Sequence, residues 1–539
     1  MKHPFSLVLI LLFGALHANT SWSQKRFSHA DSLMGHNGPA RSCYDVLHYD
    51  LHVEFDIANQ QLKGRNDITF QLTRPSKTER LQLDLQAPMV LDSIVFSGKS
   101  INWKKDGNAY FIEVPYMAKA QLVSTYFHGS PRIAKHAPWD GGIVYAQDPQ
   151  GQPWVSIACQ GLGASCWFMC KDSQADEPDA ADMYFTVPNP LSCVSNGRLI
   201  EKLPGDKTTT FHWQVRNPIN AYNIIPYIGN YSELSETYSG VKGPLSIHFW
   251  ALNSHAKQAK LRMPEIKKTL RAFEYWFGPY PFYEDGYQLV EAPYLGMEHQ
   301  SAVAYGNGFQ NGYLGMDLSG TGYGLKWDYI IVHESGHEWF GNNITTKDIA
   351  DMWVHEGFTD YSETLYTEYY YGKEAASAYC LGIRSSIQND KPIIGPYGVN
   401  TEGSGDMYYK GANMLHMIRA IANNDSLFHQ LLVGLNTEFY HQTVTSEQVE
   451  AYIEKTLGLE LTSLFDQYLR RAELPELVVT KKGEEMLLKW SHCAPDFRCQ
   501  VVCSEGTFWV DTKTATAVKI NPTRRFAIDP RMLCSIKQK

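Results

Sequence analysis

The chain has 539 residues, more than one hydrophobic core usually serves, so we expect several domains. Hydrophobic residues make up 44% of the sequence and charged residues 19%, which is typical of a globular protein. The formal net charge of −9 argues against the basic surface that nucleic-acid binding requires, so no nucleic-acid partner is expected.

The first 23 residues have the pattern of a secretory signal peptide. Lys2 precedes an apolar run over residues 5–16 that is too short to cross a bilayer. The Ser-Trp-Ser sequence at 21–23 offers a cleavage site, and Ala15 and Ala18 are alternatives. We therefore expect an exported mature chain, periplasmic or extracellular, without a transmembrane segment.

Residues 24–243 are predicted to form an all-β domain. Segments such as LHVEFDI (51–57), DITFQL (67–72) and SIVFSG (93–98) alternate apolar and polar residues, and turn formers separate them. This alternation continues to about Tyr238.

Helical spacing dominates residues 244–472. The segment PEIKKTLRAFEYWF (264–277) predicts a helix with a proline in its first turn. The segments GANMLHMIRAIA, SLFHQLLVGLNTEFY and TSEQVEAYIEKTLG read as amphipathic helices, and the last opens with a capping pattern from Thr445 to Gln448. Residues 473–539 return to strand patterning and predict a small β module.

Ten cysteines leave the disulfide question open, because neither their count nor their spacing defines a pairing. The pairs Cys166/Cys170 and Cys499/Cys503 are interpreted as buried thiols or disulfides rather than as metal ligands.

The stretch VHESGHEWFGN (332–342) places two histidines four residues apart. Positions i and i+4 of a helix lie on nearly the same face, so His333 and His337 would hold one metal ion. A catalytic zinc ion normally takes a third protein ligand. Glu356, eighteen intervening residues after His337 and flanked by apolar residues, is the candidate, since a lone buried acid is costly unless paired or metal-bound. The alternative interpretation is that the two histidines are spaced this way by chance and bind no metal.

HESGH followed by WVHEGFTDYSE resembles the gluzincin zinc metallopeptidases of the aminopeptidase N and leukotriene hydrolase family. The segment YLGMEHQSAVAYG (294–306) resembles the family's Gly-x-Met-Glu-Asn exopeptidase motif, and MYYKGANML (407–415) resembles its Tyr-x-Lys-Gly motif. The resemblance implies a multidomain α+β fold. It comprises an N-terminal all-β saddle domain, a thermolysin-like, mostly helical catalytic domain and a small C-terminal β-sandwich. The large helical domain common at the C-terminal end of the family is not expected in these 539 residues.

The resemblance implies a zinc aminopeptidase. Such an enzyme would bind one Zn²⁺ ion and act on peptides that carry a free N-terminus. His333, His337 and Glu356 would bind the ion, and Glu334 would act as the general base on the attacking water. The phenol of Tyr408 would stabilise the oxyanion. Tyr409 is the rival for this role, but the Tyr-x-Lys-Gly register favours Tyr408.

Recognition of the substrate's α-ammonium group is assigned to Glu298, because a carboxylate beside the metal forms a charge-assisted hydrogen bond. Gly296 and Met297 of the same motif are predicted to line the substrate site. Gln160, in a β-domain segment that resembles a family cleft segment, is a second candidate amine contact, with a surface glutamine as the alternative. Leu295 and His299 depart from the family pattern and leave the backbone shape here open.

The carboxylates that would orient the metal-binding histidines cannot be chosen from the sequence, which offers Glu338, Asp360 and Glu363.

Two other functions use the same residues: an epoxide hydrolase with the same metal and tyrosine, and a non-catalytic peptide-binding protein. The absence of a helical domain to bind a lipid carboxylate disfavours the first, and the intact Glu334 and Tyr408 disfavour the second.

Overall fold

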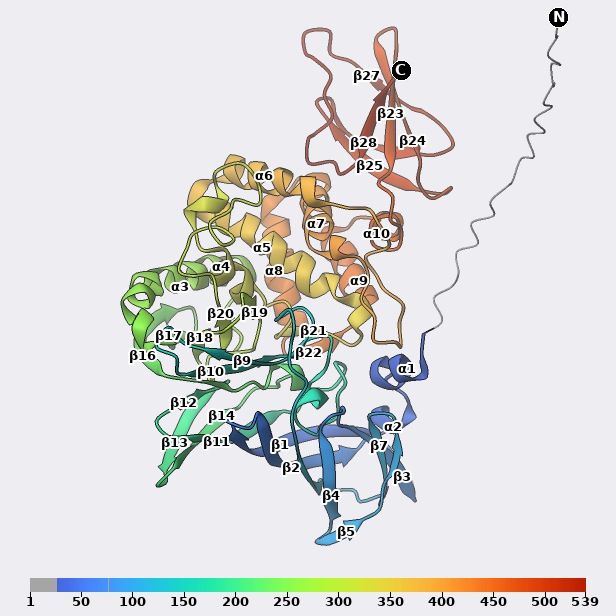
Figure 1. Ribbon diagram of the computed structural model, residues 1–539. Helices are drawn as coiled ribbons and strands as arrows, with labels where there is room; N and C mark the ends of the chain where they lie inside the picture. Colours follow the sequence, from blue (N-terminus) through green and yellow to red (C-terminus); the bar gives the residue numbers. More distant parts are fainter. Residues whose placement is uncertain (1–26, 76) are drawn as a thin grey trace, which may run out of the picture.

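The computed structural model describes residues 27–75 and 77–539 (Figure 1). The predicted signal peptide lies outside the described residues. A β-rich part forms the lower half of Figure 1, helices form the middle, and a small β module lies at the top. The predicted fold class, with an N-terminal β domain, a mostly helical middle and C-terminal strands, is confirmed.

The N-terminal β domain is built on an eight-stranded sheet. Its strands bury alternate residues, as the period-two pattern predicts. The strands, in spatial order, are β13 (Arg198–Pro204), β14 (Thr208–Val215), β11 (Ala180–Pro188), β1 (Tyr44–Asp56), β2 (Gln61–Leu72), β8 (Gln121–Gly129), β4 (Val90–Phe96) and β5 (Lys99–Ile101).

Two smaller sheets and two short helices complete the domain. One sheet contains β3 (Thr78–Asp84), β7 (Ala109–Pro115) and β6 (Lys104–Asp106). The other contains β12 (Ser192–Val194), β15 (Tyr227–Gly229), β10 (Pro153–Ala158) and β9 (Gly142–Gln147). The helices are α1 (His29–Gly35) and α2 (Pro39–Ser42). The chain leaves β10 two residues before Gln160, and β10 lies in the part of the β domain next to the helical part (Figure 1).

A five-stranded sheet joins the β domain to the helical part. It contains β16 (Tyr231–Gly240), β17 (Gly243–Leu252), β18 (Tyr287–Glu291), β20 (Val303–Tyr305) and β19 (Gly296–Met297). The parallel strands β17 and β18 are connected through α3 (Ala256–Phe277). The prediction that this helix starts at Pro264 is wrong, because α3 begins eight residues earlier, and AKQAKLRM is rich in strong helix formers.

Seven further helices follow, and a two-stranded sheet of β21 (Ile344–Thr346) and β22 (Gln442–Val444) lies among them. The helices are α4 (Tyr329–Gly336), α5 (Trp353–Tyr371), α6 (Lys373–Gly382), α7 (Tyr409–Ala422), α8 (Asp425–Glu438), α9 (Ser446–Leu457) and α10 (Thr462–Leu469). The predicted cap of α9 is present: the Gln448 side chain accepts a hydrogen bond from the Thr445 backbone N–H at 2.9 Å.

The C-terminal module packs on the helices. Its sheets contain β27 (Thr516–Lys519), β24 (Glu485–Ser491), β23 (Glu476–Lys482) and β28 (Ser535–Gln538), and β25 (Arg498–Cys503) with β26 (Gly506–Asp511). Buried residues of this module, among them Trp490 and Val501, belong to the same hydrophobic core as α3, α5 and α7. A second core fills the β domain and takes in Tyr294 and Met297 from the helical part.

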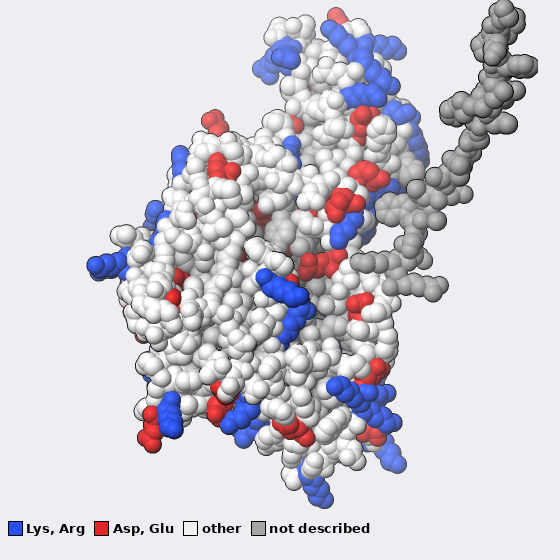
Figure 2. Space-filling model, in the orientation of Figure 1, with Lys and Arg blue, Asp and Glu red and all other residues white. Residues whose placement is uncertain are grey.

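The ten cysteines, all within the described residues, are free thiols. Among the described helices, none is both long enough and apolar enough to cross a membrane. On the face shown in Figure 2 acidic and basic side chains are interspersed, and Lys and Arg side chains gather over the C-terminal module.

Candidate metal centre and active site

Two neighbouring helices bring His333, His337 and Glu356 together. Asp328 caps α4 by accepting a hydrogen bond from the Ile331 N–H at 3.4 Å, and α4 carries His333 in its last turn. His337 follows the last residue of α4 and retains helical backbone angles, so it stays one turn below His333. Glu356 lies in the first turn of α5. Its Oε2 atom lies 3.8 Å from Nε2 of His333 and 3.3 Å from Nε2 of His337.

The far side of each imidazole is held by an acceptor. Nδ1 of His333 lies 2.7 Å from Oε1 of Glu363, whose other oxygen accepts a hydrogen bond from the Tyr379 hydroxyl. Nδ1 of His337 lies 3.0 Å from the carbonyl oxygen of Phe340. Both rings are therefore oriented with Nε2 toward Glu356, as metal-binding histidines are. Of the three acids that the sequence offered, Glu363 makes this contact, Asp360 lies beside it, and Glu338 instead accepts from Tyr280.

The geometry fits a tetrahedral metal ion. Two ligand atoms about 2.0–2.2 Å from one ion lie roughly 3.3–3.6 Å apart, close to the distances found here. Oε2 of Glu356 is buried and accepts no hydrogen bond from any described residue. An unsatisfied buried carboxylate oxygen that faces two imidazole nitrogens is costly, and an ion between them removes that cost.

Glu334 lies on the same helix and faces the substrate side of this cluster. Its carboxylate, a carboxylate oxygen of Glu298 and a ring nitrogen of His337 lie within 4.8 Å of one another. Burial raises the pKa of Glu334, which favours proton uptake by this carboxylate. Gly296 makes room for it: a Cβ atom at that position would lie 2.5 Å from Oε1 of Glu334.

Glu298 is held by two donors from the β domain. Oε1 accepts hydrogen bonds from the Gln160 side-chain amide and, at 2.9 Å, from the Tyr222 hydroxyl. Burial raises the pKa of Glu298 to about 7. The structure thus brings Gln160 into the cleft, whereas Tyr222 was not predicted, because a tyrosine in a short turn (NAYN) carries no sequence signal.

His299, which departs from the family pattern, is fully buried behind Glu298. Its Nδ1 atom lies 2.6 Å from the Tyr227 hydroxyl, and burial lowers its pKa to about 3, so the ring is neutral. It lies outside the set of residues that line the cleft.

Tyr408 lines the cleft and Tyr409 does not. The Tyr408 ring is stacked near His333, with the ring centroids 6.2 Å apart. Burial holds the pKa of its phenol well above the ordinary value, so it remains a neutral hydrogen-bond donor. The register argument from the sequence therefore agrees with the geometry.

These groups line an open cleft, whose volume, with the solvent at its mouth included, is about 670 Å³. Besides the predicted site residues it is lined by five that the sequence did not indicate: Pro138, Trp139, Met352, Glu402 and Met407. Glu402 lies in the loop TEGSGD, whose turn formers predict only a connection between helices.

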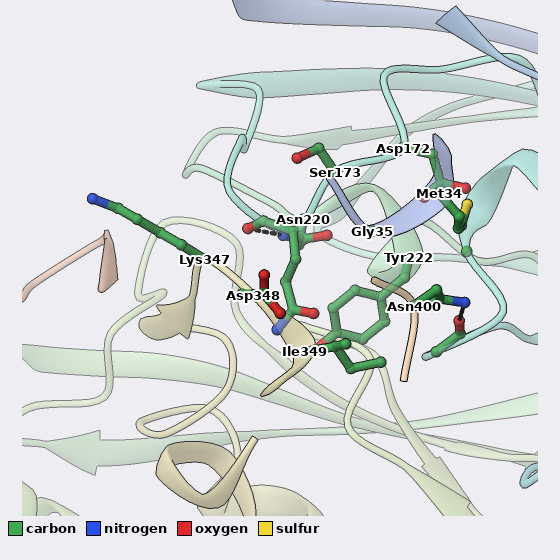
Figure 3. A pocket seen from close by; sticks show the side chains of 13 residues that line it. Met34, Gly35, Asp172, Ser173, Asn220, Tyr222, Lys347, Asp348, Ile349 and Asn400 are labelled. Atoms are coloured by element: carbon green, nitrogen blue, oxygen red, sulfur yellow. Dashed lines mark hydrogen bonds between the residues drawn. The ribbon is translucent and has the colours of Figure 1, made fainter. Parts of the chain in front are cut away.

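A smaller pocket lies behind Tyr222 (Figure 3). Met34 and Gly35, the loop after β10, residues 347–349 and Asn400 line it. The Asn400 side chain donates a hydrogen bond to the carbonyl oxygen of Gly161 at 2.8 Å, which ties the segment before Glu402 to the residue after Gln160. This contact joins the segment that carries Glu402 to the segment that carries Gln160.

Residues 263–468 match the family model described as the peptidase family M1 domain. This stretch is an M1 peptidase domain. The match covers α4 to α9, and it confirms the resemblance to the aminopeptidase N and leukotriene hydrolase family.

Named relatives of the M1 domain are aminopeptidases. The chain is 22% identical over 462 residues to aminopeptidase N of Lactobacillus helveticus, with 79% of this chain and 51% of the relative covered. It is 21% identical over 484 residues to endoplasmic reticulum aminopeptidase 1 of Mus musculus, with 82% and 50% covered. The chain thus spans about half the length of the curated relatives it matches.

Solved structures share the fold around the M1 domain. The M1 zinc metallopeptidase from Deinococcus radiodurans has a TM-score of 0.69 and 20% sequence identity, with 83% of this chain and 97% of that chain covered. A variant of that enzyme bound to a Tyr-Ser-Ala substrate superposes equally well, with the same TM-score of 0.69.

Proposed function

We propose that this chain is a zinc-dependent aminopeptidase that hydrolyses the first peptide bond of peptides with a free N-terminus. One observation carries the proposal: the carboxylate of Glu298 lies within 4.8 Å of both Glu334 and His337. A substrate ammonium group on Glu298 leaves room for one residue before the metal centre. The scissile bond is then the first one.

His333, His337 and Glu356 would hold one zinc ion, in keeping with the zinc metallopeptidases of similar fold. When bound, the ion supplies Lewis acidity toward the substrate carbonyl and lowers the pKa of a water to about 7. Glu363 and the Phe340 carbonyl would keep both imidazoles neutral at Nε2 and correctly oriented.

Glu334 is the proposed general base. Its carboxylate takes a proton from the attacking water and delivers it to the amine that leaves. The backbone of Gly296 lies close against this carboxylate, which lines the cleft. A base that is already positioned beside the metal centre needs little reorganisation at the moment of proton transfer.

Tyr408 is the proposed oxyanion donor. Its phenol is neutral across physiological pH and donates to the oxygen on which negative charge develops. Glu298, Gln160 and Tyr222 form the proposed ammonium site, in which Glu298 supplies the charge and the other two fix its position.

The test is an assay of purified mature protein on aminoacyl arylamides and on their N-acetylated counterparts, with zinc content measured in parallel. Cleavage of the free amines alone, lost in Glu334→Gln with the zinc content kept, is expected. Equal cleavage of both sets would contradict the amine site, and a protein that binds no zinc would contradict the catalytic proposal.

We further propose export of the mature chain, on the sequence pattern of residues 1–23 alone. N-terminal sequencing of protein recovered from cell fractions tests this: an intact Met1 in the recovered protein would contradict it.

A further inference from the structure

Glu402 is the one carboxylate lining the cleft to which the proposed mechanism gives no role. Among the described residues it accepts no hydrogen bond and forms no ion pair, whereas Glu298 accepts from Gln160 and Tyr222 and Glu356 faces two imidazoles. Lys391 attracts it but makes no ion pair. A partly buried carboxylate without a partner is costly, and a cationic guest would remove that cost.

The chain on both sides of Glu402 is held by hydrogen bonds to neighbouring segments. Asn400 donates to Gly161, and the Ser404 N–H donates to the carbonyl oxygen of Pro392 at 2.9 Å. A Cβ atom on Gly161 would lie 3.4 Å from Oε1 of Glu402. The carboxylate therefore lies beside the loop that follows Gln160.

The residues that line the cleft together with Glu402 suit a substrate side chain with a long aliphatic part. Met297, Met352 and Met407 line the same cavity and are each less than a tenth exposed. Methionine side chains adapt to flexible alkyl chains, and lysine and arginine bury their stems while their charged ends seek a polar partner. Trp139 is 72% exposed in the same lining, and its ring face attracts cations.

From this arrangement we infer that Glu402 selects peptides whose first residue is lysine or arginine. The inference rests on the proposed aminopeptidase function and names its substrate class. Glu298 binds the α-ammonium group, the methionines contact the stem of the first side chain, and Glu402 accepts a hydrogen bond from its cationic end. The α-ammonium group does not need Glu402, because Glu298 already lies beside Glu334 and His337.

The experiment compares kcat/KM for lysyl and norleucyl arylamides, which differ in the ammonium group, and for arginyl and citrullyl arylamides. Wild type is expected to prefer the cationic member of each pair. Glu402→Gln should lower the lysine-to-norleucine ratio by about 10–100-fold, the range for a hydrogen bond to a charged group. Glu402→Asp should retain part of the preference. Glu374→Gln, which removes a charge from the exposed start of α6, is the matched control and should leave the ratio unchanged.

A wild-type ratio near one that Glu402→Gln does not change overturns the inference and leaves the aminopeptidase standing. An equal fall for lysyl and norleucyl substrates also overturns it, because Glu402 then acts on a group common to both. If zinc-loaded wild type cleaves no arylamide, the proposed function fails. Calorimetric binding of lysinamide and norleucinamide to Glu334→Gln, with and without Glu402→Gln, then decides the inference. A preference for lysinamide that requires Glu402 supports it, and equal binding overturns it.

Discussion

The side-chain amide of Gln160 donates a hydrogen bond to the carboxylate of Glu298 across 138 positions of the sequence. The bond joins the loop after β10 of the β domain to the segment that begins with β19, next to the candidate metal-binding residues. The β domain is therefore part of the candidate amine site.

Gln160→Ala should lower kcat/KM on free-amine substrates by about tenfold, since it removes one hydrogen bond to a charged group. Steady-state kinetics on a leucyl arylamide measures this. Gln152→Ala, in the exposed turn between β9 and β10, is the control and should have no effect. Equal values for Gln160→Ala and wild type would remove Gln160 from the amine site.

Gly296→Ala should lower kcat by about 100-fold or more, because the new methyl group would lie 2.5 Å from Oε1 of Glu334 and would displace the proposed base. Zinc content, measured by atomic absorption, should stay at the wild-type level. Gly405→Ala is the control, since a Cβ atom there meets no atom within 4 Å. Full activity of Gly296→Ala would show that the position of Glu334 does not matter.

Glu363→Gln should weaken zinc binding by about 10–100-fold, because His333 loses its anionic partner at Nδ1 while the volume of the side chain is kept. Competition with a chelator of known affinity gives the dissociation constant. An unchanged zinc affinity would assign the Glu363 contact to packing.

Stability should depend on pH through Asp328, which is fully buried at the start of α4 and accepts hydrogen bonds from Tyr305 and Asn307. Burial raises its pKa to about 6 from an ordinary value of 3.8. The carboxyl group of Asp328 therefore loses its proton at a lower pH in the unfolded chain than in the folded chain. The contribution of this group to the free energy of unfolding is complete below pH 4 and is lost as the pH rises through 6.

Asp328→Asn cannot ionise and should escape this loss. Relative to wild type, the variant should gain about 1–3 kcal/mol between pH 4 and pH 8, the size of a shift of about two pKa units. Urea unfolding at both pH values measures the difference. A variant that loses stability at pH 8 would show that Arg262, whose Nε atom lies 3.8 Å from Oδ2, outweighs burial.

The sequence alone determined the candidate metal-binding residues and the order of the β and helical parts. HESGH is a local pattern, because helix geometry by itself puts His333 and His337 on one face. Alternation in 51–57 and helical spacing in 446–457 are also local, so β1 and α9 appear where they were expected. The start of α3 was misplaced because a proline is most common in the first turn of a helix, and the prediction placed Pro264 there. In the structure Pro264 lies inside α3, a position that a helix tolerates only at a cost in stability.

The tertiary structure decided which residues meet. Glu363 rather than Glu338 contacts His333, and Tyr408 rather than Tyr409 lines the cleft, although each choice is between two residues with the same functional group. Tyr222 and Glu402 enter the site from loops that carry no periodic signal. Their positions depend on how the β domain packs against the helices, and that packing is set by buried contacts between segments far apart in the chain, which no local pattern encodes.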